Sequence, residues 1–201
     1  RLPLLTLIFT YNLFAQLTEN FDTGLAGSYT TGNQVLNSGT WYTQDVYNEF
    51  AGNSRSGRSA RLDDDANGAN LTSPVINSGV GEISFWYREL NSGGGIIEIQ
   101  KSIDGVNYTT IATQAFAGTT YAQFTYAVND ASTGLTIRIL SDDNAGHLII
   151  DDFSTTAYSP SGNQPPQINN ITQTPTNGNV TSSDAVSVSA DVTDSDSNVA
   201  N

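Results

Sequence analysis

Cysteine is absent from the 201 residues, and histidine occurs once, at position 147. Without cysteine the chain has neither disulfides nor thiolate metal sites, whatever compartment it occupies. His147 lies in a turn before an apolar run, and the sequence contains no H-E-x-x-H, P-loop or G-x-S-x-G motif. We therefore expect His147 to be structural or solvent-facing, and we assign no catalytic residue to these positions.

Basic residues are also scarce. The chain carries 7 Lys and Arg against 20 Asp and Glu, a formal net charge of −13. A chain this acidic is repelled by nucleic-acid phosphates, so we expect no direct nucleic-acid binding. The acidity suits solubility and the binding of divalent cations, and the composition is typical of exported β proteins.

No apolar run is long enough to cross a membrane. Residues 2–14 form an apolar segment with the length of a secretory h-region, which is too short for a membrane span. Ala15 followed by Gln16 fits a cleavage site. We predict a signal peptide over residues 1–15 and a protein that is secreted or held at the cell surface. The alternative is that the segment is a buried first strand.

Short alternating runs separated by Gly, Asn, Asp and Ser follow, and none has the periodicity of an amphipathic helix. This pattern predicts an all-β fold, an antiparallel jelly-roll β-sandwich over residues 16–158. The predicted strands are residues 17–21, 40–45, 59–62, 69–72, 81–88, 96–102, 109–114, 122–128, 135–140 and 148–155.

The last part of the chain differs in composition. Residues 159–166 are rich in Pro and Gly and predict a linker. Residues 167–174 and 185–193 alternate again, as the first two strands of an Ig-like β-sandwich would. Residues 167–201 are too few to close such a domain. We expect a poorly packed fragment and a chain that continues past Asn201.

An apolar run ends abruptly in two adjacent carboxylates, Asp151 and Asp152. Carboxylates that leave a buried strand must be solvated, hydrogen-bonded or neutralised by a cation. The first and last strands of a sandwich are often neighbours, which would bring Glu19 and Asp22 close to Asp151 and Asp152. Because calcium accepts oxygen ligands from scattered positions, we expect these four residues to hold a structural calcium ion. The alternative is a strand end capped in solvent.

A second, weaker metal candidate is the D-x-D-x-N-G spacing formed by Asp63, Asp65, Asn67 and Gly68. This spacing matches the first half of an EF-hand-type calcium loop. Pro74 occupies the twelfth position, so the bidentate Glu is missing, and no helices are predicted beside it. A plain acidic turn is the favoured interpretation.

Outward-facing positions on the predicted strands carry aromatic, charged and amide side chains. Successive side chains of a strand point to opposite faces, so those beside the apolar positions should face away from the core. Such a face could stack on and hydrogen-bond a polysaccharide. Its predicted members are Trp86, Arg88, Glu98, Gln100 and Arg138. The competing interpretation is a solvated face with weak Arg–Glu pairs.

Three motifs suggest a family: NFD at 20–22, SGRSARL at 56–62 and IDDF at 150–153. Together they resemble jelly-roll modules grouped with MAM domains and calcium-containing carbohydrate-binding modules. The resemblance implies a structural calcium held by Asp22 and Asp152. MAM domains normally carry cysteines, so the carbohydrate-binding or bacterial variant fits this chain better.

A second resemblance rests on five longer stretches: NFDTG at 20–24, SGTWYTQDVYNEFAGNSRSGRSARL at 38–62, SFWYRELNSGGG at 84–95, ATQAFAGTTY at 112–121 and RILSDDNAGHLIIDDF at 138–153. Over most of its length the chain looks like the N-terminal modules of bacterial multidomain secreted proteins. Such modules precede Ig-like segments, often with endonuclease I-type or lamin-tail domains beyond them. The resemblance leaves two functions open. In the first, we expect a monomeric, non-catalytic, calcium-stabilised module that binds extracellular polysaccharide or acts as a spacer. Alternatively, it is the accessory region of a secreted endonuclease or other hydrolase whose catalytic domain lies beyond Asn201.

Overall fold

The structure, a computed structural model, describes residues 15–64, 68–91, 93–141, 146–159, 167–175, 181, 183 and 185–193. It divides into two compact units, Arg1–Ser159 and Pro160–Asn201. All regular secondary structure in the described residues is β-strand, which confirms the all-β prediction. Apart from Ala15 and Ser159, the predicted signal peptide and linker lie outside the described residues.

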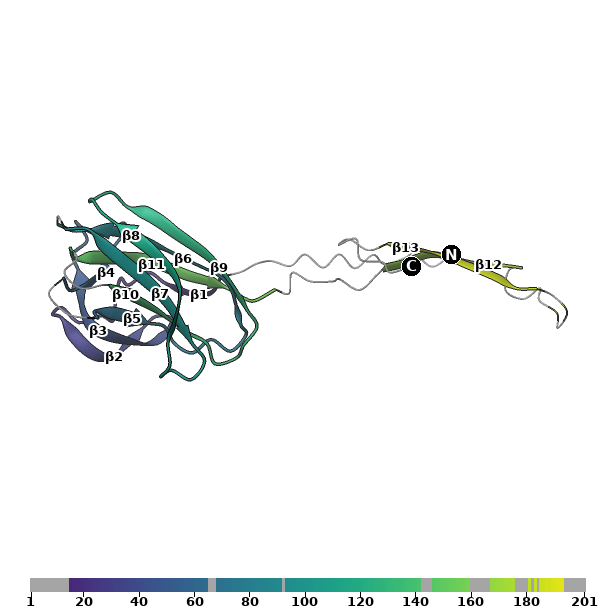
Figure 1. The fold of residues 1–201 in the computed structure, drawn as a ribbon, viewed down its shortest axis with the longest axis horizontal. Coiled ribbons are helices and arrows are strands. Elements are labelled where there is room, and N and C mark those ends of the chain that lie inside the picture. The colour runs from purple at the N-terminus through teal and green to yellow at the C-terminus, as the bar shows by residue number, and fades with distance from the viewer. Residues whose placement is uncertain are drawn as a thin grey trace. The chain divides into compact units, whose positions relative to one another are not determined.

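The first unit contains eleven strands in one antiparallel sheet (Figure 1). They are β1 (Ala15–Glu19), β2 (Thr30–Leu36), β3 (Gly39–Glu49), β4 (Ser59–Leu62), β5 (Asn70–Thr72), β6 (Val80–Glu89), β7 (Gly95–Ser102), β8 (Thr109–Phe116), β9 (Ala122–Asp130), β10 (Thr136–Ser141) and β11 (Leu148–Thr156).

β2 is the strand that the sequence analysis missed. Its central residues Gly32, Asn33 and Gln34 are typical of turns, and Gly and Asn have low strand propensity. The strand forms because it pairs with β3, where Gln34 lies opposite Trp41. Tertiary pairing therefore overrides the local preference.

The sheet folds over on itself at β3 to make two layers. The strand order is β8-β7-β10-β5-β3-β4-β11-β6-β9, with β2 added on β3 and β1 on β11. The first half of β3 pairs with β5 and its second half with β4. Asp45, between the two halves, has a φ of 51°, a left-handed conformation that Asp tolerates better than most residues. The result is an antiparallel β-sandwich of the jelly-roll type.

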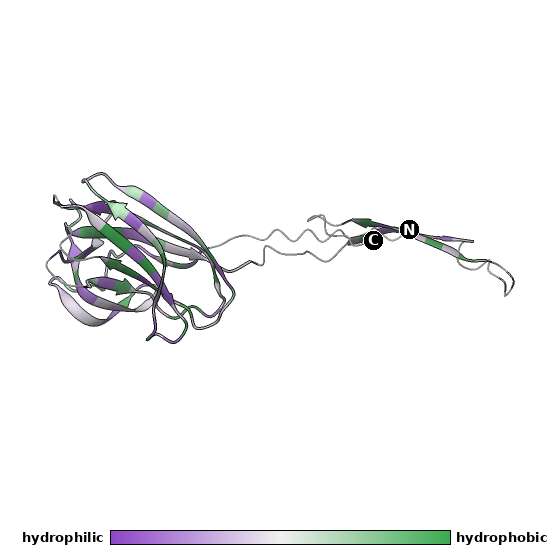
Figure 2. Cartoon of the chain, viewed as in Figure 1, coloured by the Kyte–Doolittle hydropathy of each residue, from purple (hydrophilic) through white to green (hydrophobic). Residues whose placement is uncertain are grey.

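The core between the layers is apolar and includes an aromatic centre. Bands of hydrophobic and hydrophilic residues alternate along the strands (Figure 2). Trp41 is fully buried, and its ring meets those of Phe21 and Phe153 edge-on, at centroid distances of 5.4 and 5.2 Å. Its Nε1 donates a hydrogen bond to Ser38 Oγ at 2.8 Å. Such edge-to-face pairs add to the stabilisation that burial gives.

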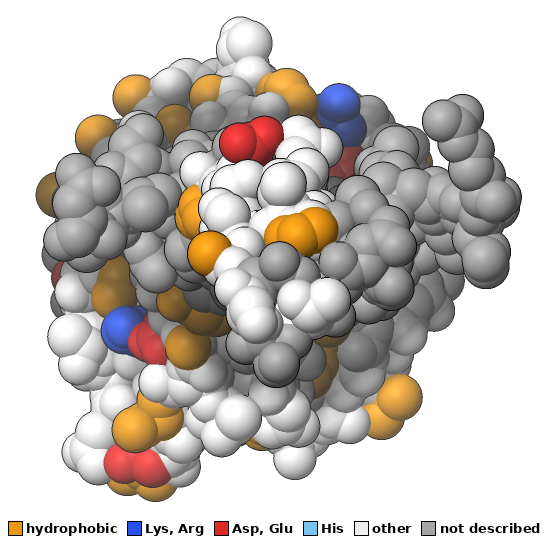
Figure 3. Space-filling view, turned by 90° about the vertical axis from the view of Figure 1, so that its right-hand side faces the viewer, with side chains coloured by type: hydrophobic (Ala, Val, Ile, Leu, Met, Phe, Trp, Pro, Cys, Tyr) orange, Lys and Arg blue, Asp and Glu red, His pale blue; other side chains and the backbone are white. Residues whose placement is uncertain are grey.

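In the second unit, β12 (Gln167–Thr174) pairs antiparallel with β13 (Ser187–Thr193). The apolar side chains Ile168, Ile171 and Val188 are 62–67% exposed, so these two strands bury no core of their own in the described residues. In the view of Figure 3, the hydrophobic side chains that are coloured lie in small separate groups. Scattered groups of this kind are normal for a protein surface.

Candidate functional site

A cleft of about 670 Å³ lies on the layer that contains β1, β6, β9 and β11. The buried positions of β6, Ile83 and Phe85, face the core, and the alternate residues Ser84 and Trp86 therefore line the cleft, as alternation predicts. Trp86 lies opposite Gln123 in the ladder between β6 and β9. The cleft is also lined by the polar residues Asn20, Asn37, Arg55, Gln123 and Asp152.

Arg55 covers one part of the Trp86 ring. Its guanidinium carbon lies 4.2 Å from the ring centroid, and the same guanidinium forms an ion pair with the Asp152 carboxylate. The side chains of Arg55 and Asp152 are 42% and 33% exposed. Exposed ion pairs of this kind contribute roughly 0–1 kcal/mol, so Arg55 can leave the indole at small cost.

Two carboxylates of the predicted calcium site, those of Glu19 and Asp22, accept hydrogen bonds from backbone amides and from one side-chain hydroxyl. Glu19 is buried. Its Oε1 accepts a hydrogen bond from the Phe21 amide at 3.0 Å, and its Oε2 accepts from the amide and hydroxyl of Ser38 at 2.9 and 2.7 Å. Asp22 Oδ1 accepts from the Arg58 amide at 2.6 Å. Both carboxylates thus fix loops that connect strands.

The other two carboxylates lie at a β-bulge in β11. The register shifts between Asp151 and Ser154, and Asp152 has a φ of 47°. Asp151 is fully buried; its Oδ2 accepts from the Arg55 amide at 3.0 Å and its Oδ1 from the Asp152 amide at 2.9 Å. Burial raises the pKa of Asp151 to about 6, and the Asp152 charge adds to this, while the backbone donors oppose it.

These four carboxylates share one region of the fold but do not converge on one point. In the part of the chain that the structure describes, ligand atoms of three His or acidic side chains lie within 4.8 Å of one another at Asp63, Asp64 and His147, and not among these four residues. The oxygens of Glu19, Asp22 and Asp151 are directed at protein N–H and O–H groups. As arranged, the set does not fit a shared calcium ion, and calcium stabilisation stays a prediction.

The predicted recognition residues lie on two different layers. Trp86 and Arg88 are on β6, whereas Glu98 and Gln100 are on β7 and Arg138 is on β10. In a two-layer sandwich the outward side chains of different layers point away from each other. The alternation of side chains predicted which positions face outward, but the layer on which each strand lies depends on the strand order. The prediction of a single recognition face is therefore wrong.

The residues on the β7–β10 layer bind one another. Arg138 Nε donates to Gln100 Oε1 at 2.7 Å, and the guanidinium carbon lies 3.7 Å from the Tyr108 ring centroid. Gln100 Nε2 in turn donates to Glu98 Oε2 at 2.9 Å. On the other layer, Arg88 donates to the Thr119 carbonyl at 2.9 Å.

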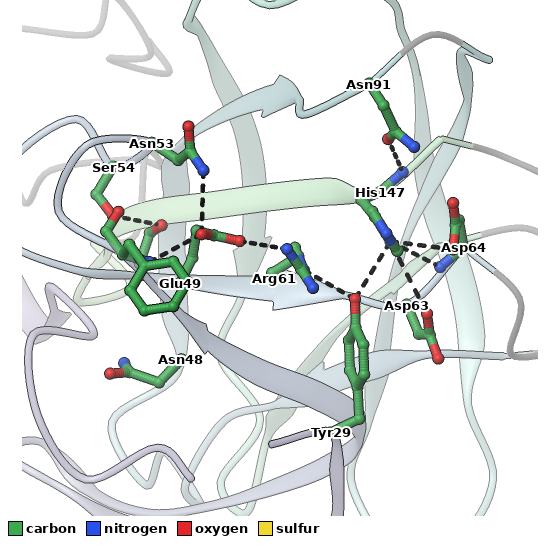
Figure 4. Close-up of polar contacts among 12 residues, drawn as sticks. Tyr29, Asn48, Glu49, Asn53, Ser54, Arg61, Asp63, Asp64, Asn91 and His147 are labelled. Atoms are coloured by element: carbon green, nitrogen blue, oxygen red, sulfur yellow. Dashed lines mark hydrogen bonds and ion pairs between the residues drawn. The ribbon is translucent and has the colours of Figure 1, made fainter. Parts of the chain in front are cut away.

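The second metal candidate is described only in part. Asp65 and Asn67 lie outside the described residues. Asp63 lies near Asp64 and His147, and the possible ligand atoms of these three side chains lie within 4.8 Å of one another (Figure 4). Sequence reasoning missed Asp64 because its spacing does not fit the D-x-D-x-N pattern. It also missed Arg55, which comes from an irregular loop with no periodicity.

No protein-family model and no curated protein matches the sequence. Solved structures with a similar fold include the K1 cleaved adhesin domain of Lys-gingipain from Porphyromonas gingivalis W83, at 14% identity and a TM-score of 0.53 over 71% of this chain and 98% of that one. The CBM22-1 xylan-binding domain of Paenibacillus barcinonensis Xyn10C has 17% identity and a TM-score of 0.50, covering 74% and 97%.

A third similar structure is the C-terminal family 22 carbohydrate-binding module of Clostridium thermocellum Xyn10B, at 8% identity and a TM-score of 0.51, covering 72% and 95%. At these identities the similarity shows a shared fold. The described residues contain no helix long and apolar enough to span a membrane.

Proposed function

We propose that the chain is a non-catalytic glycan-binding module of a secreted or surface protein, and that the Trp86 cleft is its binding site. The observation that carries the proposal is the cleft itself, which combines an indole with amide and hydroxyl side chains in a space of about 670 Å³. That volume lies within the range of small-molecule sites. Structures of similar fold are described as xylan-binding or carbohydrate-binding modules, which supports this class of ligand.

The lining favours a neutral sugar. Asn20, Asn37 and Gln123 offer amide donors and acceptors that match sugar hydroxyls. Glu19 and Asp152 line the cleft against the single guanidinium of Arg55, so the lining is negative, and the chain as a whole has a net charge of −13. Uronic acids and sulfated sugars would be repelled by this charge. The expected ligand is a stretch of neutral extracellular polysaccharide.

Arg55 would move when a sugar binds. The cation–π contact with Trp86 and the exposed pair with Asp152 are worth roughly 1–2 kcal/mol together. A sugar ring that stacks on the indole replaces the first contact. The displaced guanidinium can then donate to sugar hydroxyls, so little of the interaction energy is lost.

The experiment is a binding screen of the purified chain on neutral and acidic polysaccharides, with affinities measured by titration for those retained. Trp86→Ala should weaken binding at least tenfold, a loss of about 1.4 kcal/mol. Arg138→Ala, on the other layer, is the control and should bind as the unmodified chain does. Loss of binding in Arg138→Ala alone would move the site to the β7–β10 layer.

A screen with no retained polysaccharide would argue for a spacer role. The other function, an accessory region of a secreted endonuclease or other hydrolase, concerns sequence beyond Asn201 and stays a prediction.

A further inference from the structure

The end of β4 and the start of β11 lie side by side because the two strands pair antiparallel, with Leu62 opposite Leu148. Asp63 and Asp64 follow β4 directly, and His147 precedes β11 directly. The pairing therefore brings two carboxylates and an imidazole, more than 80 positions apart in the sequence, to the same edge of the sandwich (Figure 4).

The distances in this group suit a small metal ion. His147 Nδ1 lies 3.1 Å from Asp64 Oδ1 and 3.8 Å from Asp63 Oδ1. Zinc binds nitrogen and carboxylate oxygen at about 2.0–2.2 Å in tetrahedral geometry, so neighbouring ligand atoms are roughly 3.3–3.5 Å apart. The three side chains are 19–21% exposed, recessed but open to an ion from solvent.

Hydrogen bonding around His147 leaves acceptor atoms facing one another. The Asp64 amide donates to His147 Nδ1 at 3.2 Å, which makes Nδ1 the nitrogen without a proton. The carboxylate oxygens of Asp64 and Asp63 lie 3.1 and 3.8 Å from the same nitrogen, an arrangement that is repulsive unless a proton or a cation lies between them. A metal ion bound to Nδ1 would take the place of the amide hydrogen bond. A proton on Nδ1 could bridge to Asp64 Oδ1, but it would also face the Asp64 N–H. A metal ion needs no proton on this nitrogen.

Neighbouring groups do not supply the missing positive charge. Arg61 donates to Tyr29 Oη at 2.8 Å and forms an ion pair with the buried Glu49 at 2.7 Å. Tyr29 Oη lies 3.3 Å from His147 Nδ1. A phenol carries no positive charge, so it does not balance the two carboxylates. Within the described residues, the two aspartates form ion pairs with His147 alone.

We propose that Asp63, Asp64 and His147 form a binding site for a divalent transition metal, with zinc as the reference ion. An imidazole and two carboxylates suit zinc and its first-row neighbours, whereas calcium takes six to eight oxygens. Three protein ligands leave a fourth position for water. The ion would tie the segment after β4 to the start of β11, independently of glycan binding in the Trp86 cleft.

The test is a calorimetric titration of the metal-free, untagged chain with zinc chloride, and separately with calcium chloride, at physiological ionic strength. We expect one zinc per chain and no comparable heat from calcium. His147→Gln and Asp64→Asn should each weaken zinc binding at least tenfold. Glu82→Gln, which removes an exposed carboxylate elsewhere, is the matched control and should bind zinc unchanged.

A second measurement guards against misfolded variants: each metal-free variant should unfold cooperatively, and zinc should raise the unfolding midpoint of the unmodified chain and of Glu82→Gln only. Cobalt should give the visible absorption of a tetrahedral site, lost in His147→Gln. Zinc binding that survives in both His147→Gln and Asp64→Asn would overturn the proposal, as would the absence of zinc binding.

Discussion

Substituting Gly57 by alanine probes the contact between the β3–β4 loop and the segment that follows β1. Gly57 has a φ of +60°, and a Cβ added there would overlap the Asp22 carboxylate. That carboxylate accepts the Arg58 amide hydrogen bond, and the same loop supplies Arg55 to the cleft. The substitution therefore strains the backbone and displaces a carboxylate at once.

The expected cost follows from three contributions. A left-handed conformation costs a residue with a Cβ about 1–2 kcal/mol. Losing a hydrogen bond to a charged group costs about 1.5–3 kcal/mol. The lower entropy of the unfolded alanine chain offsets about 0.4–1 kcal/mol. The net destabilisation is roughly 2–4 kcal/mol, and at roughly 2–4 °C per kcal/mol for a unit of this size, the unfolding midpoint should fall by roughly 5–15 °C.

Differential scanning calorimetry measures the effect, with Gly52→Ala in the same loop as the control. A Cβ at Gly52 meets nothing within 4 Å, so Gly52→Ala should change stability by less than about 0.5 kcal/mol. In an Asp22→Ala background the overlap disappears, and Gly57→Ala should cost only about 0–1.6 kcal/mol, the left-handed conformation less the entropy offset. Equal midpoints for Gly57→Ala and Gly52→Ala would refute the reasoning.

Two further predictions concern the carboxylates of β11 and the predicted ion. Because burial raises the pKa of Asp151 to about 6 in the folded chain, against about 3.9 unfolded, the folded state binds the extra proton between these values. Raising the pH from about 4 to about 6 should therefore lower the unfolding free energy by about 2 kcal/mol more than in Asp151→Asn. Denaturant titration of both proteins across this range checks the sign; parallel pH profiles would contradict it. The variant His147→Gln, which impairs the proposed zinc site, separates the effect of calcium from that of zinc. If calcium stabilises the fold, millimolar calcium should raise the unfolding midpoint of this variant, and EDTA should reverse the rise. Equal midpoints in calcium and in EDTA would count against the ion.

Local pattern alone determined most of the strands. In β6 the alternation of apolar and polar residues correctly placed Ile83 and Phe85 in the core and Trp86 outside. This works because the period of two belongs to the strand itself and needs no partner. The abrupt end of the apolar run at Asp151 also correctly indicated a carboxylate that required compensation.

Tertiary structure decided which groups meet. Asp151 is compensated by the amide of Arg55, 96 positions away, and His147 meets Asp64 across 83 positions. Trp86 and Arg138 both face outward yet lie on different layers, since β3 folds the sheet between them. A strand's own sequence fixes the side to which each residue points, but its neighbours and its layer depend on hydrogen bonds to strands that are distant in the chain.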